Sequence, residues 1–169
     1  MVLIALALVA AQPALEPPAR PMEISIVRDA ITDRLRATAI LRGEGERIEI
    51  RCESPDWGDV SVRYHSRRWL ARGNPLTGQQ PLIYRFDEQR PVRRLWHVHD
   101  RTASFDDRGR LVSFLRSTMG ARRLVIRARD IENHRFDSIF TIGESSAAIT
   151  QLLQTCGSRR LNPRILPQP

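Results

Sequence analysis

The stretch LRATAILRGEGERIEIRC, residues 35–52, decides how this chain folds. Apolar and polar side chains alternate on both sides of Gly43–Glu46, and a period of two is typical of strands with one buried face. The glycine-rich centre is a turn signal. The stretch therefore predicts an antiparallel hairpin whose second strand places Cys52 on its apolar face.

The same alternation recurs before and after this hairpin. It predicts further strands near Glu23–Ile26, Val60–His65, Leu82–Asp87, Arg93–His99, Leu124–Arg129 and Phe136–Ile142.

The period changes to that of a helix twice, late in the chain. Leu111–Met119 forms one apolar helical face that Gly120 is expected to end, and Ile149–Cys156 forms another, with Ser145 as its expected cap. Strands followed by helices give the α+β class. We expect mainly an antiparallel β-sheet meander of about six to eight strands, as in a β-sandwich, with two short amphipathic helices late in the chain.

Composition divides the chain into four parts. Residues 1–11 are uncharged and apolar, which is typical of a signal-peptide core and too short to span a bilayer. Residues 12–22 are expected to be a Pro/Ala linker, residues 23–157 a single disulfide-bonded β-rich domain, and residues 158–169 a disordered basic tail. We therefore expect a protein exported to the periplasm or secreted, and not an integral membrane protein.

Two cysteines, Cys52 and Cys156, lie on the apolar faces of their predicted elements. Oxidising compartments allow disulfides, and two cysteines permit one intramolecular pairing. Two buried thiols that never pair are the alternative. With export, the sequence predicts a Cys52–Cys156 disulfide.

The formal net charge is +8, and all 27 basic residues are arginine. A GC-rich genome explains the absence of lysine, but the positive field still attracts polyanions and anionic lipid headgroups. For an exported protein we expect an envelope protein or an anionic envelope polymer as partner. Nucleic acid becomes the expected partner only if the chain stays in the cytoplasm.

The arginines cluster along predicted strands and near aromatic residues, a pattern that serves polyanion binding. The candidate polyanion-binding residues are Arg63, Arg67, Arg68, Arg93, Arg94, Arg123 and Arg127. A solvated face with acidic residues opposite is the alternative. Trp57, Trp69 and Trp96 are candidates for contacting a protein partner.

Signals for catalysis are few. His97 and His99 are two residues apart on a predicted strand, so their imidazoles face one side and are weak candidates for holding a metal ion. Gly143–Ala147 resembles a nucleophile elbow. The hydrolase fold that uses this elbow needs a histidine after the serine, and no histidine follows His134 in the sequence. The sequence has no Cys-x-x-Cys motif and no glycine-rich phosphate loop. We expect no cofactor and no enzymatic activity.

The order of several short motifs resembles a known family. The motifs are the Arg51-Cys52 strand end, the stretch Tyr84-Arg85-Phe86-Asp87, Trp96, a helix with Phe114-Leu115, and Phe140–Gly143 before a helix ending in Cys156. This layout is similar to exported type VI secretion accessory proteins of the VasI kind and, more distantly, to invasion-associated locus B proteins. It spans residues 29–157.

The resemblance implies a β-rich periplasmic domain in which residues 84–87 and Trp96 belong to the scaffold, and it carries over no catalytic residue. The two histidines beside Trp96 and the basic surface depart from the family pattern. The prediction is thus a non-enzymatic envelope protein that acts as a binding or assembly accessory module. A polyanion or anionic-lipid binder, and a metal-dependent hydrolase using His97 and His99, are the alternatives.

Overall fold

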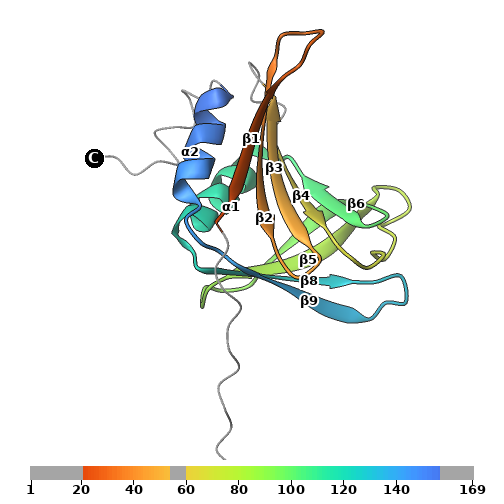
Figure 1. Cartoon of the computed structure of the whole chain (residues 1–169). Helices are drawn as coiled ribbons and strands as arrows, with labels where there is room; N and C mark the ends of the chain where they lie inside the picture. The colour runs from red at the N-terminus through yellow and green to blue at the C-terminus, as the bar shows by residue number, and fades with distance from the viewer. Residues whose placement is uncertain (1–20, 54–59, 157–169) are drawn as a thin grey trace, which may run out of the picture.

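The computed structural model describes residues 21–53 and 60–156. Within them, nine antiparallel strands form one continuous sheet in the order β1-β2-β3-β4-β7-β6-β5-β8-β9 (Figure 1). The strands are β1 (Glu23–Arg28), β2 (Leu35–Arg42), β3 (Arg47–Glu53), β4 (Ser61–His65), β5 (Gln79–Phe86), β6 (Val92–His99), β7 (Thr102–Phe105), β8 (Arg123–Arg129) and β9 (Arg135–Thr141). The helices are α1 (Arg108–Gly120) and α2 (Ser146–Thr155).

The α+β class, the antiparallel sheet and the two late helices are confirmed, but nine strands exceed the predicted six to eight. The strand that sequence reasoning missed is β7, which has only four residues. It follows β6 after a two-residue turn, Asp100–Arg101, in which Asp100 adopts a φ of 53° without the glycine that would mark such a turn. The structure also has one sheet where a sandwich would have two.

The sheet is not a simple meander, because the chain does not place β5 beside β4. The connection after β4 passes over the positions that β7 and β6 later occupy. Residues 66–78, here called the strap, carry the chain from β4 to β5, and β7 and β6 fill the gap between them. The strap lies along two turns: the N–H of Leu70 donates to the carbonyl of Asp100, and the N–H of Ala71 donates to the carbonyl of Arg129, both at 2.9 Å. These hydrogen bonds hold the crossover against the ends of the strands.

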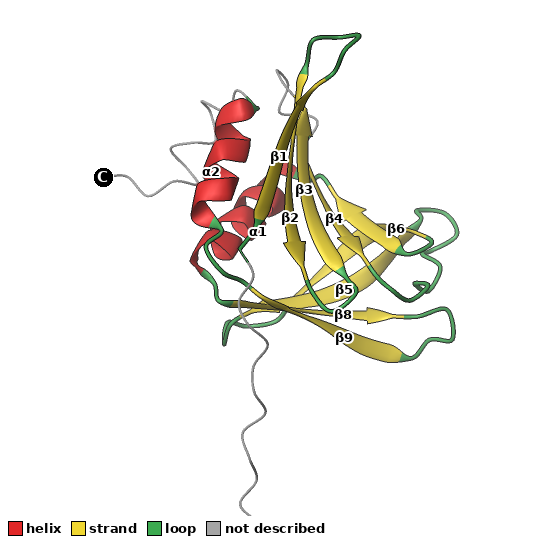
Figure 2. Ribbon diagram, in the orientation of Figure 1, coloured by secondary structure: helices red, strands yellow, loops and turns green. Residues whose placement is uncertain are grey.

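The sheet curls so strongly that β4 and β9 approach each other across the core (Figure 2). The Tyr64 hydroxyl of β4 lies 2.6 Å from Ser138 Oγ of β9, and the Tyr64 ring meets Phe140 edge-on at 6.4 Å. Burial raises the pKa of Tyr64, so its hydroxyl stays neutral in this contact. In the β2–β3 turn, a Cβ at Gly43 would lie 3.0 Å from the Phe140 ring, and glycine permits this close approach.

Apolar side chains on the inward face form the core together with the helices. Phe114 of α1 packs edge-on against Tyr84, Phe86 and Phe105. Helix α2 lies beside β1 and β2, where the small, fully buried Ala37 and Ala39 of β2 leave room for a helix. Strand alternation therefore separates an apolar inward face from a polar outward face.

A disulfide joins Cys52 near the end of β3 to Cys156 just after α2, with Cα atoms 6.1 Å apart, which confirms the predicted pairing. Asp107 caps α1, as its side chain accepts from the N–H of Arg110 at 2.9 Å. Ser145 holds the N-cap position of α2 but makes no side-chain capping bond. Its hydroxyl donates instead to the carbonyl of Thr118 at 2.8 Å and so ties α2 to α1.

Several predictions concern residues outside the described ones: the signal-peptide-like segment 1–11, most of the linker, the tail 158–169, and Trp57. Met22, near the start of the described residues, is buried. No helix among the described residues is long and apolar enough to cross a membrane.

Candidate functional site

The outward face of the sheet is rich in arginine because each of these residues alternates with a buried neighbour. Arg85, for example, lies between Tyr84 and Phe86, whose rings enter the core. According to the register of the strands, the arginines on this face are Arg36, Arg42, Arg47, Arg51, Arg63, Arg85, Arg93, Arg123, Arg127, Arg129 and Arg135.

Four of these arginines gather over three adjacent strands, and we call Arg85, Arg93, Arg123 and Arg127 the arginine patch. Arg93 of β6 and Arg127 of β8 both pair with Ile83 of β5, so they flank it in one row. Arg85 and Arg123 belong to the following rows of the same face. Strand spacing places neighbouring patch residues about 7–10 Å apart at Cα. Each charge therefore lies within about one Debye length of its nearest neighbour in the patch.

Only one guanidinium group of the patch is paired with a carboxylate among the described residues, although the backbone N–H of Arg123 donates to Asp87 at 2.8 Å. Arg127 donates to both carboxylate oxygens of Asp137 at 2.7 Å, and this contact lowers the pKa of Asp137. Arg85, Arg93 and Arg123 form no ion pair within residues 21–53 and 60–156. Three of the four guanidinium groups of the patch are therefore free of ion pairs, and the patch keeps a net positive charge.

The arginines of β2 and β3 on the same face are instead matched by acids. Arg36 lies 3.6 Å from Glu53, and Arg42 pairs with Glu23 at 3.0 Å. Glu49, whose side chain is 3% exposed, contacts Arg51 and lies 3.8 Å from Arg47. This part of the face therefore fits the alternative prediction, in which the arginines form a solvated surface and pair with nearby acids.

Glu49 also accepts from His65, whose Nε2 lies 2.8 Å from a Glu49 carboxylate oxygen. Burial and the nearby charge of Arg47 lower the pKa of His65, and they outweigh the attraction of Glu49. The imidazole is thus a neutral structural partner of the carboxylate at neutral pH.

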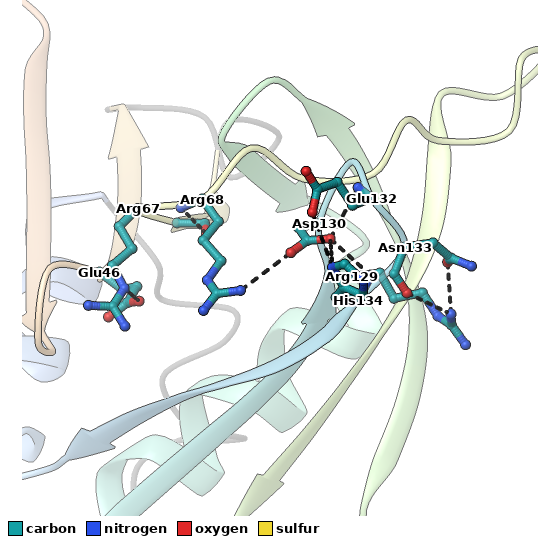
Figure 3. A network of polar contacts seen from close by, with 9 residues as sticks. Glu46, Arg67, Arg68, Arg129, Asp130, Glu132, Asn133 and His134 are labelled. Atoms are coloured by element: carbon teal, nitrogen blue, oxygen red, sulfur yellow. Dashed lines mark hydrogen bonds and ion pairs between the residues drawn. The ribbon is translucent and has the colours of Figure 1, made fainter.

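Arg67 and Arg68, two predicted polyanion-binding residues, are tied down in the strap (Figure 3). Arg67 pairs with the nearly buried Glu46 at 3.2 Å, and Arg68 lies 3.3 Å from Asp130 in the β8–β9 turn. The Arg68 guanidinium also stacks over Phe136 at 5.1 Å. Both side chains therefore hold the strap against the curled sheet, and each already has a carboxylate partner.

Asp130 organises the β8–β9 turn and faces the guanidinium of Arg68 (Figure 3). Its Oδ1 accepts from the N–H groups of Glu132 and His134 at 3.1 and 2.9 Å. Burial favours the neutral acid, but these donors, the charge of His134 and a hydrogen bond from Arg68 lower the pKa of Asp130 below its usual value. The carboxylate is a structural anchor.

The remaining predicted arginines lie apart from one another. Arg63 of β4 is on the outward face, two strands from the arginine patch, with no carboxylate partner among the described residues. Arg94 follows Arg93 directly, yet alternation turns it to the inward face, where it borders a hollow beside α1. The structure thus places Arg93, Arg123 and Arg127 together and separates Arg63, Arg67, Arg68 and Arg94 from them.

The tryptophans differ in exposure. Trp96 is completely buried, with its ring 4.5 Å from that of Phe105, so it is a core residue and the prediction that it contacts a partner is wrong. Trp69, in the strap, is 46% exposed, and Arg101 lies over its ring at 5.0 Å. Ile131, 64% exposed, is adjacent because its N–H donates to the Trp69 carbonyl. Trp69 therefore remains available to a partner.

His97 and His99 lie on one face of β6, and each has a different polar neighbour. His97 Nε2 is 2.9 Å from the Gln79 side-chain nitrogen, and His99 Nδ1 is 3.3 Å from Asp100. Among the described residues, no group of three or more His, Cys, Asp or Glu side chains is placed to hold a metal ion. The elbow-like Ser145 is buried and engaged with Thr118.

Sequence reasoning missed two residues of these surfaces. Arg85 was assigned to the scaffold, although its place between two buried aromatic residues was a signal that it faces outward. Arg101 belongs to the β6–β7 turn, and its position over Trp69 depends on the strap, which no local pattern indicates. Comparisons with protein-family models, with curated proteins and with solved structures find no match to this chain.

Proposed function

We propose that the protein is a non-enzymatic binding module of the cell envelope that holds an anionic polymer against the arginine patch. The observation that carries this proposal is the contrast on one sheet face between matched arginines and three unpaired ones, Arg85, Arg93 and Arg123. Guanidinium groups retain their charge at all physiological pH values and bind sulfate, phosphate and carboxylate groups in a bidentate manner.

The side chains between the arginines favour a polymer over a lipid surface. Ile83 and Val125, at the centre of the patch, are only partly exposed, so they are poorly placed for insertion among acyl chains. The exposed apolar side chains Leu95 and Ile139 lie at its edges, on β6 and β9. Rows of cations on a regular sheet instead suit a chain of repeated anionic groups, which contacts several arginines at once.

The test is binding to heparin as a function of salt concentration, with a variant carrying Arg85→Gln, Arg93→Gln and Arg123→Gln. Each lost contact is expected to reduce the slope of log Kd against log salt by about 0.7–0.9, or about 2–3 for the triple variant. The matched control carries Arg36→Gln, Arg42→Gln and Arg47→Gln. It loses the same formal charge from the acid-matched strands, and we expect its slope to change little.

Equal losses for the two triple variants would contradict the patch, because only the overall charge would then matter. Binding that is indifferent to salt would contradict polyanion recognition altogether. Tighter binding to vesicles containing phosphatidylglycerol than to heparin would replace the polymer with an anionic lipid surface.

A protein partner is the second candidate, and Trp69 is the observation that favours it. Exposed aromatic residues beside arginine are the residue types that dominate binding energy at protein interfaces. Trp69, Arg101 and Ile131 form such a surface at the strap, away from the core. An assembly partner in the envelope, as in the type VI secretion setting that the sequence resemblance implies, would dock here.

The protein partner is tested by placing a photo-crosslinking residue at position 69 in cells and, as control, at position 31. Ile31 is 94% exposed in the β1–β2 turn, so it samples the solvent equally well. We expect one discrete adduct from position 69 and none from position 31. Absence of an adduct at both positions would contradict a docked partner at the strap.

We further propose that the protein works in the periplasm or outside the cell. The Cys52–Cys156 disulfide supports this location, because such bonds persist in oxidising compartments and are rare in the cytosol. Mass spectrometry of a periplasmic fraction, with and without reductant, tests it. We expect a chain shortened near residue 12 that gains about two mass units on reduction. A full-length chain with free thiols would contradict export.

A further inference from the structure

The aromatic part of the core opens onto a hollow of about 370 Å³ that the arginine patch does not use. The hollow lies on the inward side of the sheet, between the start of α1 and the β5–β6 turn. Phe86, Val92 and Phe114 form its apolar wall. A volume of this size suits a small organic molecule.

Three arginines border the hollow: Arg90, Arg94 and Arg110. Arg90 and Arg94 have no carboxylate partner among the described residues, and Arg94 donates one N–H to the carbonyl of Arg93 at 3.1 Å. Asp107 is the acid at this rim. It already caps α1 through the N–H of Arg110, and its carboxylate lies 3.9 Å from the Arg110 Nε. The rim therefore keeps a net positive charge.

Tyr84 supplies a buried polar group to the same hollow. The residue is 6% exposed, and its hydroxyl has no hydrogen-bond partner within residues 21–53 and 60–156. Tyr84, Arg94 and Arg110 line the same hollow. Burial raises the pKa of Tyr84, while the charges of Arg94 and Arg110 oppose that rise. A neutral hydroxyl can donate a hydrogen bond to an anion that the bordering arginines attract.

We propose that this hollow binds a small phosphate monoester, with Arg94 and Arg110 on the phosphate oxygens, the Tyr84 hydroxyl as an additional donor, and the organic part against Phe86 and Phe114. Guanidinium forks match tetrahedral oxyanions, and charge-assisted hydrogen bonds of this kind are the strong ones. A sulfate monoester presents similar oxygens, so it is the competing source of the same chemistry.

The test is isothermal titration calorimetry of the full chain with phenyl phosphate, inorganic phosphate and phenyl sulfate. We expect saturable binding of one phenyl phosphate per chain, more tightly than inorganic phosphate because the phenyl ring contacts the apolar wall. Arg94→Gln is expected to weaken binding about tenfold or more, and Tyr84→Phe by a smaller factor. Tighter binding of phenyl sulfate would assign the site to sulfate esters instead.

Arg93→Gln is the matched control, because Arg93 is adjacent in sequence but lies on the opposite face of the sheet. We expect it to leave phenyl phosphate affinity unchanged and to weaken heparin binding, whereas Arg94→Gln does the reverse. The two sites can therefore fail separately. Equal weakening by both variants, or no saturation at millimolar phenyl phosphate with circular dichroism unchanged, would overturn the proposal.

Discussion

The two halves of the outward sheet face are both rich in arginine, but the arginines of one half are paired with acids and most of those in the other half are not. In β2 and β3, each of Arg36, Arg42, Arg47 and Arg51 contacts a glutamate of the same face. In β6, β5 and β8, Asp137 pairs with the guanidinium of Arg127 alone, and Asp87 contacts the patch only through the backbone N–H of Arg123. Where acids alternate with arginines along a strand, they neutralise the positive charge of that part of the surface. The net charge of +8 does not reveal this local difference.

The matched half is also the half that the covalent bond holds. Cys52 lies in β3 and Cys156 follows α2, which packs on β1 and β2. The arginine patch lies on strands that the disulfide does not touch. We infer that the first half stabilises the domain and the second half binds, so perturbations of each should separate stability from affinity.

The largest effect is expected from removing the disulfide. The Cys52→Ala, Cys156→Ala variant loses the restraint on a loop of 104 residues, which in the chain-entropy model costs about 4–5 kcal/mol of unfolding free energy. Urea denaturation measures this loss. Heparin affinity should not change while the variant is folded, because the patch lies elsewhere.

Reductant is the control for this prediction. It should destabilise the parent to a similar extent and leave the double variant unaffected. A parent protein whose denaturation midpoint is the same with and without reductant would show that the disulfide does not restrain the folded domain.

Glu49→Gln should convert the matched half into an unmatched one. The nearly buried carboxylate is shared by Arg47, Arg51 and His65, so loss of its charge is expected to cost about 1–3 kcal/mol of unfolding free energy. The two released arginines should at the same time steepen the salt dependence of heparin binding.

The control for Glu49→Gln is Glu53→Gln, which breaks a more exposed pair 3.6 Å apart and should cost at most about 1 kcal/mol. Similar losses for the two variants would contradict the view that Glu49 is the centre of the matched half. A Glu49→Gln protein that binds heparin like the parent would mean that released arginines on β3 do not form a binding surface.

The two faces of the sheet could be predicted from the sequence because alternation is local. Ile48, Ile50 and Cys52 read as an inward face and Glu49 and Arg51 as an outward one, and the structure agrees. The Cys52–Cys156 pairing could be predicted for a related reason, since two cysteines on apolar faces have one possible partner each.

Strand order and charge matching could not be predicted in this way. The strap depends on hydrogen bonds between Leu70, Ala71 and distant turns, and no local signal indicates them. Arg67 and Arg68 looked free in sequence because their partners, Glu46 and Asp130, are 21 and 62 residues away. Arg94 was grouped with Arg93 because the two are adjacent in the chain. On a strand, adjacent side chains point to opposite faces of the sheet, so the two arginines lie apart.

The pH dependence of stability should also trace to the matched half. The folded pKa of His65 is held below the usual 6.5 by burial and by Arg47. As the pH falls through 6.5, the unfolded chain binds this proton first, so the unfolding free energy decreases until the folded pKa is passed. His65 thus contributes stability that is present above pH 6.5 and lost below it.

Urea denaturation at a series of pH values between about 7.5 and 5 measures this dependence. His65→Gln should flatten part of the decrease. His99→Gln is the control, because the side chain of His99 is 91% exposed and lies outside the Glu49 cluster. Identical pH profiles for the parent and His65→Gln would contradict the assignment to His65.

The smallest effect is expected where the patch meets its acid. Asp137→Asn removes the carboxylate that accepts from Arg127, so one more arginine becomes available and the slope of log Kd for heparin against log salt should steepen by about one. Asp33→Asn makes the same change in charge at the β1–β2 turn, where Asp33 lies 3.7 Å from Arg28. Because that turn is far from β8 in the strand order, we expect no steeper slope there. An equal gain from both variants would mean that heparin senses the total charge of the domain, and the difference between the halves of the face would then have no part in binding.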